Sequence, residues 1–495
     1  YIDDDTSGTF SVGGNTTSGA QVTEDYKLTT RKQVVDYHRE LIVGGTTTII
    51  AQNSAGTSKY NIVLDDVDHD FATIGVTGAA VTVVDEDALV LGASTVTGAY
   101  TITAGGAVTD EGTQEITGIT TISASGQTVE LDVATNNFAD EVRITGNAVT
   151  VVDEDALVLG ASTVGGALTA TATTGNITQG GALSITGTSA FTTSANDATI
   201  TLGDTSNIFT DAVSITTTDN ETGTANDSDV EINAGSSAEL KFGTLTIKGD
   251  LSTTSTHATG ISDTGVLTIH GTSSFTTSTD DATIILNSTN LFTGKVSLST
   301  AGTSGHVTLA TGALQLRLNT SEVKGNLTIA AGAAVSNHGT VTVDGATDID
   351  ANGGASNILL NSYYNDLTGT VSLDGWNVKV KNGKALELGT IDSRALILEA
   401  KGAITQAVPS VITSVGASTI TAQNGGTDYD VTLYNAANDF RGDLKFTAGN
   451  VRVRDTDGVD LALSTVSGTY HLVARGAVID SGALAITGAA TIIAQ

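Results

Sequence analysis

The sequence predicts an all-β fold, a β-solenoid built from six repeats of roughly 70–84 residues each. Three observations indicate it: long phrases recur at a regular distance, apolar residues alternate with period two, and the candidate strands are short and rich in Val, Ile and Thr. A chain of this kind repeats a small alphabet of residues suited to stacked strands and tight turns.

Two phrases recur along the chain. The string AVTVVDEDALVLGASTV occurs at 80–96 and again, unchanged, at 148–164, and a diverged form runs from Val451 to Tyr470. A second phrase, such as GNITQGGALSITGTSAFTTS at 175–194, follows in each copy. Taking its end as the boundary, we expect an N-terminal cap, junction or repeat tail at 1–51 and repeats at 52–124, 125–194, 195–278, 279–351, 352–422 and 423–495.

The elements within each repeat read as strands. Val81 and Val83 lie two residues apart, as do Leu183 and Ile185, and spacing of two places both side chains on one face of a strand. Gly, Asn, Asp and Ser separate these segments and favour turns. The sequence contains no segment longer than about ten residues with helical periodicity and a capping residue.

A solenoid explains the repeat better than a chain of six immunoglobulin-like sandwiches, because the repeats are too short for a sandwich, which takes about 100 residues. Each stacked turn needs roughly 18–25 residues, so a repeat would supply about three or four turns. A third phrase ends in a large apolar residue, at Phe71, Phe138, Phe209, Phe292, Leu367 and Phe440. We expect the phenylalanines to lie in the core or at corners, with Asn137, Asn207 and Asn438 in turns.

Composition and charge exclude several classes of protein. The 495 residues include no Cys, which excludes disulfides, and 21 Lys and Arg against 54 Asp and Glu, a net charge of −33. This charge argues against a nucleic-acid partner. Aromatic residues make up 4% of the chain, which leaves few for sugar-binding platforms. No apolar run of about 18 residues is present, so we expect no direct membrane insertion in this region.

The phrases GNITQGGALSITG and ANDFRGDLKFTAGNVRVRD resemble the repeats of large bacterial exoproteins of the filamentous-haemagglutinin and autotransporter-adhesin kind. The resemblance covers nearly the whole chain from about residue 45. It implies a right-handed parallel β-helix, export across the outer membrane and an extracellular or cell-surface location. The chain contains no Met, and the string IIAQ stands both at 49–52 and at its end, so we expect an excerpt from a longer array.

Two strings have spacing that suits calcium, which binds carboxylate and carbonyl oxygens. The first comprises Asp66, Asp68 and Asp70, and the second comprises Asp348, Asp350 and Asn352 followed by Gly353. The second string resembles half of an EF-hand loop, but Leu359 stands where that loop needs Glu. These six residues are therefore candidate calcium ligands, and a solvated acidic face is the alternative interpretation.

The sequence carries no motif for catalysis. The seven histidines occupy no common place in the repeat, and neither HExxH nor GxSxG occurs. We interpret the acidic segment 219–231 as an exposed loop. No cofactor is predicted apart from calcium.

We therefore expect a non-enzymatic structural protein: an adhesive extracellular stalk, fibre or filament that associates with itself end to end and binds host or cell-surface glycans or proteins. The alternative is a carbohydrate-active parallel β-helix enzyme, which predicts a groove with converging carboxylates.

Overall fold

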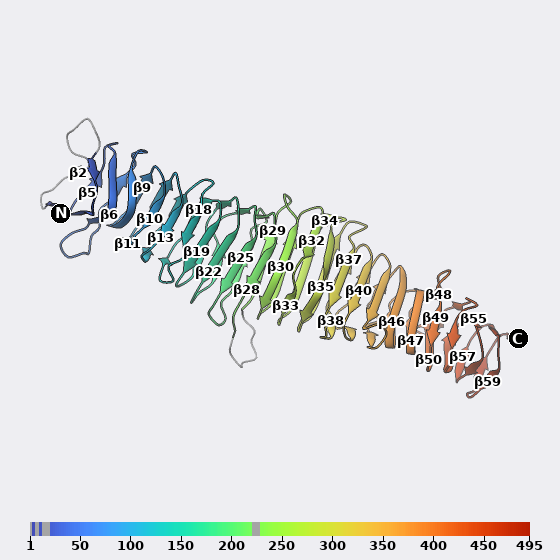
Figure 1. Ribbon diagram of the computed structural model, residues 1–495. Coiled ribbons are helices and arrows are strands. Elements are labelled where there is room, and N and C mark those ends of the chain that lie inside the picture. The colour runs from blue at the N-terminus through green and yellow to red at the C-terminus, as the bar shows by residue number, and fades with distance from the viewer. Residues whose placement is uncertain (1, 5–8, 12–19, 220–227) are drawn as a thin grey trace. The chain divides into compact units, whose positions relative to one another are not determined.

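The computed structural model describes residues 2–4, 9–11, 20–219 and 228–495. These residues form a parallel β-solenoid of about 22 turns and contain no helix, which confirms the predicted fold class (Figure 1). The right-handed sense of the solenoid stays a prediction. The chain divides into two compact units, Tyr1–Asp250 and Leu251–Gln495, and each is described by itself.

The first unit consists of two ladders of parallel strands that the chain visits alternately, one ladder on each side of every turn. Ladder A contains β1 (Ile2–Asp4), β3 (Ala20–Val22), β4 (Tyr26–Thr30), β6 (Leu41–Ala51), β8 (Asp70–Gly78), β10 (Leu89–Leu91), β11 (Ser94–Val96), β13 (Val108–Asp110), β14 (Gln114–Ile116), β16 (Val129–Leu131), β17 (Asn137–Phe138), β19 (Val149–Asp153), β22 (Leu168–Ala172), β25 (Ser189–Thr193), β28 (Val213–Thr216) and β30 (Leu240–Ile247). Ladder B contains β2 (Thr9–Ser11), β5 (Gln33–Val35), β7 (Ile62–Leu64), β9 (Val81–Asp85), β12 (Tyr100–Ala104), β15 (Thr120–Ser123), β18 (Val142–Gly146), β20 (Leu157–Leu159), β21 (Ser162–Val164), β23 (Ile177–Gln179), β24 (Leu183–Ile185), β26 (Ile200–Leu202), β27 (Ile208–Phe209) and β29 (Val230–Ala234).

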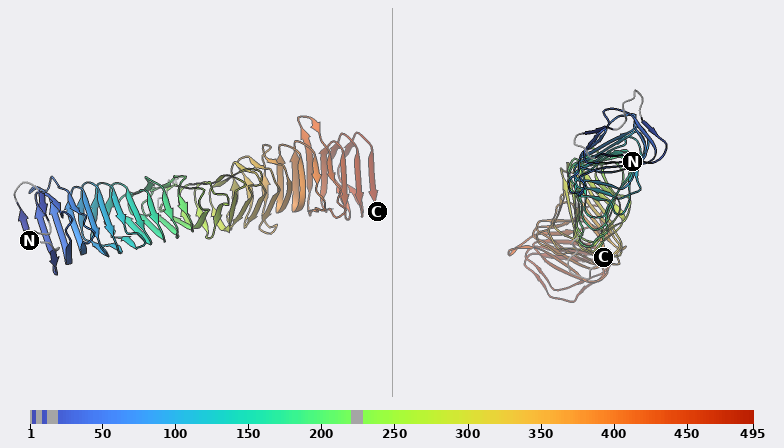
Figure 2. Two further views of the ribbon diagram at one scale, coloured as in Figure 1. Left: turned by 90° about the horizontal axis from the view of Figure 1, so that it is seen from above. Right: turned by 90° about the vertical axis from the view of Figure 1, so that its left-hand side faces the viewer.

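The second unit has the same construction, and its stacked strands are seen from above in Figure 2. Ladder C contains β32 (Gly260–Asp263), β33 (Leu267–Ile269), β35 (Thr283–Phe292), β37 (Val307–Thr311), β40 (Leu327–Ala331), β43 (Thr347–Ala351), the first halves of β46 (Thr370–Asn382) and β47 (Leu386–Ala400), β48 (Ile404–Gln406), β49 (Ile412–Ser414), β52 (Val431–Leu433), β53 (Asp439–Phe440), β55 (Val451–Asp455), β58 (Tyr470–Ala474) and β61 (Ala490–Ala494). Ladder D contains β31 (Leu251–Ser255), β34 (Ser273–Asp280), β36 (Lys295–Ala301), β38 (Leu316–Leu318), β39 (Ser321–Val323), β41 (Val335–Asn337), β42 (Val341–Val343), β44 (Ile358–Leu360), β45 (Asp366–Leu367), the second halves of β46 and β47, β50 (Ser418–Asn424), β54 (Asp443–Ala448), β56 (Val459–Leu461), β57 (Ser464–Val466), β59 (Val478–Asp480) and β60 (Leu484–Ile486). The short β51 (Thr427–Asp428) forms an antiparallel hairpin with β50.

The relation between repeat and turn follows from the register of neighbouring strands. Val81 lies beside Tyr100, Tyr100 beside Thr120, and Thr120 beside Val142, so three turns separate Val81 from Val142 within ladder B. The chain then crosses to ladder A and reaches Val149, which is the copy of Val81 in the unchanged string. One repeat therefore spans about three and a half turns.

Equivalent strands of consecutive repeats lie in opposite ladders, because each repeat ends half a turn further along the solenoid than a whole number of turns. In the first copy of the unchanged string, β9 lies in ladder B and β10 in ladder A. In the second copy, the equivalent β19 lies in ladder A and β20 in ladder B. The second phrase behaves in the same way in the second unit: its four copies lie in ladders C, D, C and D. A given strand of the repeat therefore returns to the same ladder only in every second repeat.

The core is a narrow column of alternating apolar side chains. The recurring Phe71, Phe138, Phe209, Phe292 and Phe440 are all buried, with at most 2% of their surface exposed, as we predicted. Phe209 packs edge-on against Phe191, which lies on β25 in the opposite ladder, with ring centroids 6.2 Å apart. Leu367 takes the same buried place in its copy.

Candidate functional site

A surface hollow of about 270 Å³ lies on the second unit. β46 supplies Asp374 and Trp376, and β47 supplies Asp392 and Arg394. In both strands these residues stand two apart and face outward, while the residues between and before them, such as Leu373 in β46 and Ile391 in β47, face the core. Side chains from two adjacent turns therefore meet at this hollow.

Register places three carboxylates in one column. Asp350 of β43 lies beside Asp374, and Asp374 lies beside Asp392, so the column crosses three consecutive turns. Burial raises the pKa of Asp374 above its ordinary value, and the negative charges of Asp350 and Asp392 raise it further. The hollow is thus rich in hydrogen-bond acceptors.

A parallel column next to the carboxylates provides an aromatic platform. Trp376 is the only Trp in the chain, and 46% of its surface is exposed. The guanidinium of Arg394 lies 4.8 Å from the centroid of the indole and holds the ring in a cation–π contact. Gly354, with a φ of 75°, completes the lining, and any side chain at this residue would collide with the carboxylate of Asp374.

Two further aromatic residues of the second unit are stacked with cations. Lys381 lies 4.3 Å from the centroid of the Tyr363 ring, whose hydroxyl donates a hydrogen bond to Glu399. Arg452 lies 3.5 Å from the centroid of the Tyr434 ring. Sequence reasoning missed these contacts and the hollow, because it predicted positions only for the recurring phenylalanines and treated the other aromatic residues as part of one percentage.

The first calcium candidate string is spread along the entry to β8. Asp66 accepts a hydrogen bond from the backbone N–H of Asp68 at 3.0 Å, and its own N–H donates to Asp36. Asp68 is exposed, and Asp70 is half-buried at the first position of the strand. None of the three belongs to the single group of at least three His, Asp or Glu found among the described residues whose ligand atoms lie within 4.8 Å of one another.

The second string lies beside the hollow, which the next residue, Gly353, lines. Asp348 and Asp350 both face outward from β43, and Asn352 follows in a left-handed turn with a φ of 58°. Asp350 accepts a hydrogen bond from the N–H of Gly353 at 2.7 Å. Burial and the charge of Asp350 raise the pKa of Asp348. The string thus contributes Asp350 to the carboxylate column rather than forming a closed loop of ligands.

Calcium binding stays a prediction, and chelation tests it. If calcium holds either string, adding EGTA to the purified protein will lower the melting temperature, and restoring calcium will recover it. A melting temperature that is the same in EGTA and in calcium would leave the six residues as solvated surface charge.

The group that could hold a metal comprises Asp36, His38 and Asp65 near the N-terminus. Asp36 is buried, and its carboxylate already accepts hydrogen bonds from three backbone N–H groups and from Nε2 of the buried His69, at 2.8 Å. Burial alone would raise the pKa of Asp36, but these hydrogen bonds outweigh it and lower the pKa. His69 Nδ1 in turn accepts a bond from the N–H of Leu41.

This His–Asp pair is one version of a corner that recurs in every repeat. Two residues before each buried Phe or Leu, a buried side chain accepts a backbone N–H from the preceding turn and pairs with a polar side chain there. The other pairs are Asn136 with Asp110, Asn207 with Gln179, Asn290 with Asp263, Asn365 with Asn337, and Asn438 with Gln406. The predicted turn residues Asn207 and Asn438 occupy this position, but in the NNF copy it is Asn136, not Asn137.

A second recurring corner holds a buried carboxylate. Asp85 accepts hydrogen bonds from the N–H of Phe71 at 2.8 Å and of Asp87 at 3.2 Å. Asp153 and Asp455 do the same in their repeats, while Asn382 takes this place in another copy and accepts from Leu367. Burial raises the pKa of Asp85, Asp153 and Asp455 to about 6, against an ordinary value of 3.8.

These three carboxyls predict a specific pH dependence. Because the folded state holds their protons more tightly than the unfolded state, their contribution to stability is lost as the pH rises from about 4 through about 6. We expect a variant with Asp85→Asn, Asp153→Asn and Asp455→Asn to lose most of the rise in melting temperature that the parent shows between pH 7 and pH 5. Glu86→Gln, at an exposed neighbour, should keep it. An unchanged pH profile in the triple variant would contradict the assignment.

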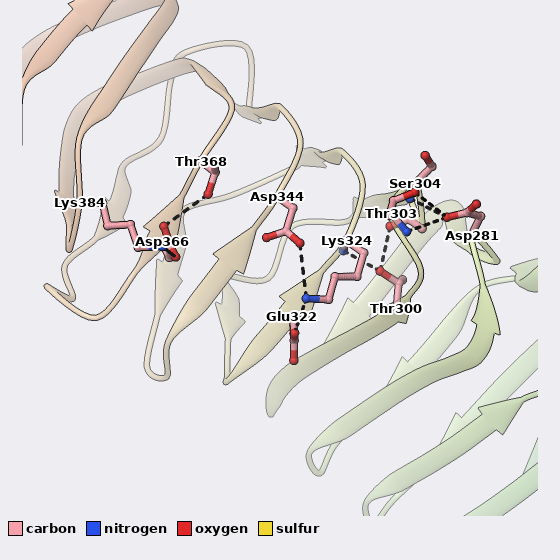
Figure 3. A network of polar contacts seen from close by, with 11 residues as sticks. Asp281, Thr300, Thr303, Ser304, Glu322, Lys324, Asp344, Asp366, Thr368 and Lys384 are labelled. Carbon is pink, nitrogen blue, oxygen red and sulfur yellow. Dashed lines mark hydrogen bonds and ion pairs between the residues drawn. The ribbon is translucent and has the colours of Figure 1, made fainter.

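Ion pairs join successive turns on the surface of the second unit. Figure 3 shows Lys324 between Glu322 and Asp344, with Nζ–O distances of 2.6 and 3.4 Å, and Lys384 paired with Asp366 at 2.5 Å. These pairs are accessible to solvent, so screening by water keeps the contribution of each to stability small. The pairs of Lys324 with Asp344 and of Lys384 with Asp366 connect neighbouring turns, and none of the pairs forms an enclosed site.

The fold and its surface define a β-solenoid repeat protein, and the described residues include no helix able to cross a membrane. The chain belongs to the family described as repeats of unknown function (DUF5649), which matches it at 78–145, 146–216, 227–299, 304–374, 375–447 and 448–495. The six matches equal our six repeats in number, but each begins later than the corresponding repeat as we divided it, since a periodic sequence can be divided at any phase. Comparisons with curated proteins and with solved structures found no match. The finer likeness to filamentous haemagglutinin and autotransporter adhesins therefore stays a resemblance.

Proposed function

We propose that this chain is a non-enzymatic structural segment of an extracellular surface protein and that it serves in adhesion. Its role is to extend a stable surface turn by turn, because continuous parallel ladders pair the backbone of each turn with the next. The observation that carries the adhesive part is the set of partly exposed aromatic rings held by cations, at Trp376, Tyr363 and Tyr434. Exposed aromatic anchors are typical of binding surfaces.

Surface labelling tests the proposed location. Antibodies raised against the purified chain should label intact source cells, and protease added outside the cells should remove the label. Labelling that appears only after permeabilisation would overturn the proposal.

Self-association is the second part of the proposal, since open edges of stacked strands can pair with another copy. We expect sedimentation velocity and electron microscopy to show assemblies that grow with protein concentration. Monodisperse particles of one chain at every concentration would contradict filament formation.

A carbohydrate-active enzyme is a second candidate, and one observation favours it. Asp374 and Asp392 are paired neighbours in adjacent strands at the hollow, and the pKa of Asp374 is raised, as suits a general acid beside a second carboxylate. Release of reducing ends from a polysaccharide, lost in Asp374→Asn and in Asp392→Asn, would support catalysis. Binding of sugar without such release favours adhesion.

A further inference from the structure

We propose that the hollow between β46 and β47 is a binding subsite for a neutral glycan, with Trp376 as its stacking platform and Asp374 and Asp392 as its hydroxyl acceptors. This inference deepens the adhesive function proposed above and rests on it. Three features of the hollow carry it: the aromatic face, the acceptors and the sign of the charge.

The indole of Trp376 is partly exposed, although leaving a large apolar ring in contact with water costs free energy. A Trp ring in water forgoes the burial that most large apolar side chains obtain, and here 46% of its surface remains accessible. Arg394 fixes the ring by stacking at 4.8 Å. A rigid, exposed aromatic ring matches the apolar C–H face of a pyranose, because little conformational freedom remains to be lost when the sugar binds.

The acceptors lie beside the platform. Asp374 stands two residues before Trp376 in β46, so both side chains leave the same face of the strand. Asp392 is its register partner on the next turn. Carboxylates accept strong hydrogen bonds from hydroxyl groups, and two of them on adjacent turns can bind neighbouring hydroxyls of one sugar. Gly353 and Gly354 present backbone without side chains, which leaves room for the ring to approach.

The balance of charge at the hollow disfavours acidic sugars, because the carboxylates of Asp374 and Asp392 line it and the guanidinium of Arg394 is the one cation among its lining residues. The column of Asp350, Asp374 and Asp392 places three carboxylates on consecutive turns. A uronate or a sialic acid brought to this column would meet like charge at short range. The chemistry of the site thus fits a neutral hexose or an oligosaccharide of neutral hexoses.

The experiment uses the protein's own fluorophore. Because Trp376 is the only Trp in the chain, intrinsic tryptophan fluorescence reports on this site alone. The full chain is titrated with maltotetraose, cellotetraose, chitotetraose, mannotetraose and galactotetraose, and separately with tetragalacturonate. We expect at least one neutral tetrasaccharide to shift or quench the emission saturably and tetragalacturonate to bind at least roughly tenfold more weakly.

Variants measured by calorimetry assign the contacts. Trp376→Ala should weaken binding by roughly tenfold or more, Trp376→Phe should retain most of it, and Asp392→Asn should weaken it several-fold. Leu463→Ala, which removes an exposed apolar side chain outside the hollow, should bind as the parent does. Because Trp376 and Asp392 are on the surface, circular dichroism should show that each variant is folded.

Two results would overturn the inference: no saturable response to any of the five neutral sugars, or tighter binding of tetragalacturonate than of all of them. Failure here is distinguishable from failure of the proposed function, because surface labelling and sedimentation are read independently of sugar binding. Release of reducing ends in the same titration decides between the enzyme and the adhesin and leaves the site assignment intact.

Discussion

Asn438→Ala is expected to unfold its corner of the solenoid locally. Its side chain accepts hydrogen bonds from the N–H of Ile412 at 3.0 Å and from Gln406, and donates to Gln406 and to the carbonyl of Leu433 at 3.2 Å. Asn438 is fully buried, so Ala would remove an interior hydrogen bond from each of two backbone groups, the N–H of Ile412 and the carbonyl of Leu433. Each such group costs about 1–3 kcal/mol, which gives a loss of about 2–6 kcal/mol.

The effect should be measured where it occurs, because the stability of a repeat array is largely the sum of local terms. We expect hydrogen–deuterium exchange in peptides spanning 404–446 to accelerate by at least about tenfold, since about 1.4 kcal/mol corresponds to a factor of ten. Asn424→Ala, at an exposed Asn in the same unit, should change the exchange little. Equal exchange in Asn438→Ala and the parent would show that the corner is not a structural requirement.

Phe209→Ala is expected to cost about 3–5 kcal/mol, because it removes a fully buried ring and its edge-on contact with Phe191. The chain itself provides the matched control, since Leu367 occupies the equivalent place in another repeat. Phe209→Leu should therefore cost markedly less than Phe209→Ala. Limited proteolysis between 183 and 216 and hydrogen exchange in the same range would measure both variants, and equal effects of Leu and Ala would contradict the packing role.

The fold could be predicted because its causes are local. Alternation at Val81 and Val83, turn residues between short segments and unchanged recurrence of one string indicate stacked strands before any contact is known. The recurring phenylalanines were recognised as core residues for the same reason. Which ladder each copy joins could not be read in this way, because it depends on the sum of individual turn lengths, and these differ from one turn to the next.

The candidate site escaped sequence reasoning for a different reason. Asp350, Asp374 and Asp392 are unequally spaced along the chain, and they align only because the register shifts between β46 and β47. Trp376 belongs to none of the recurring phrases, so comparing the repeats did not single it out. An exposed residue that breaks a repeat has no packing reason for its identity, and a search for such residues would have found the tryptophan.

One repeat spans three and a half turns, so its copies alternate between ladders, and disulfide trapping tests this relation most directly. The chain has no cysteine of its own, so each double variant can form one bond within the chain. Glu130 and Thr150 are register partners in β16 and β19. Cysteines at these two positions should form a disulfide readily, because neighbouring strands lie about 4.8 Å apart.

The alternative arrangement, in which each repeat spans a whole number of turns, predicts other register partners for Thr150. If three equal turns separated the two copies of the unchanged string, Thr150 would lie beside Gln127, and with four equal turns it would lie beside Val133. We expect the Glu130→Cys, Thr150→Cys variant to be oxidised rapidly, and the variants that pair Thr150→Cys with Gln127→Cys or with Val133→Cys to remain reduced. Preferential bridging from position 127 or 133 would contradict the half-turn repeat.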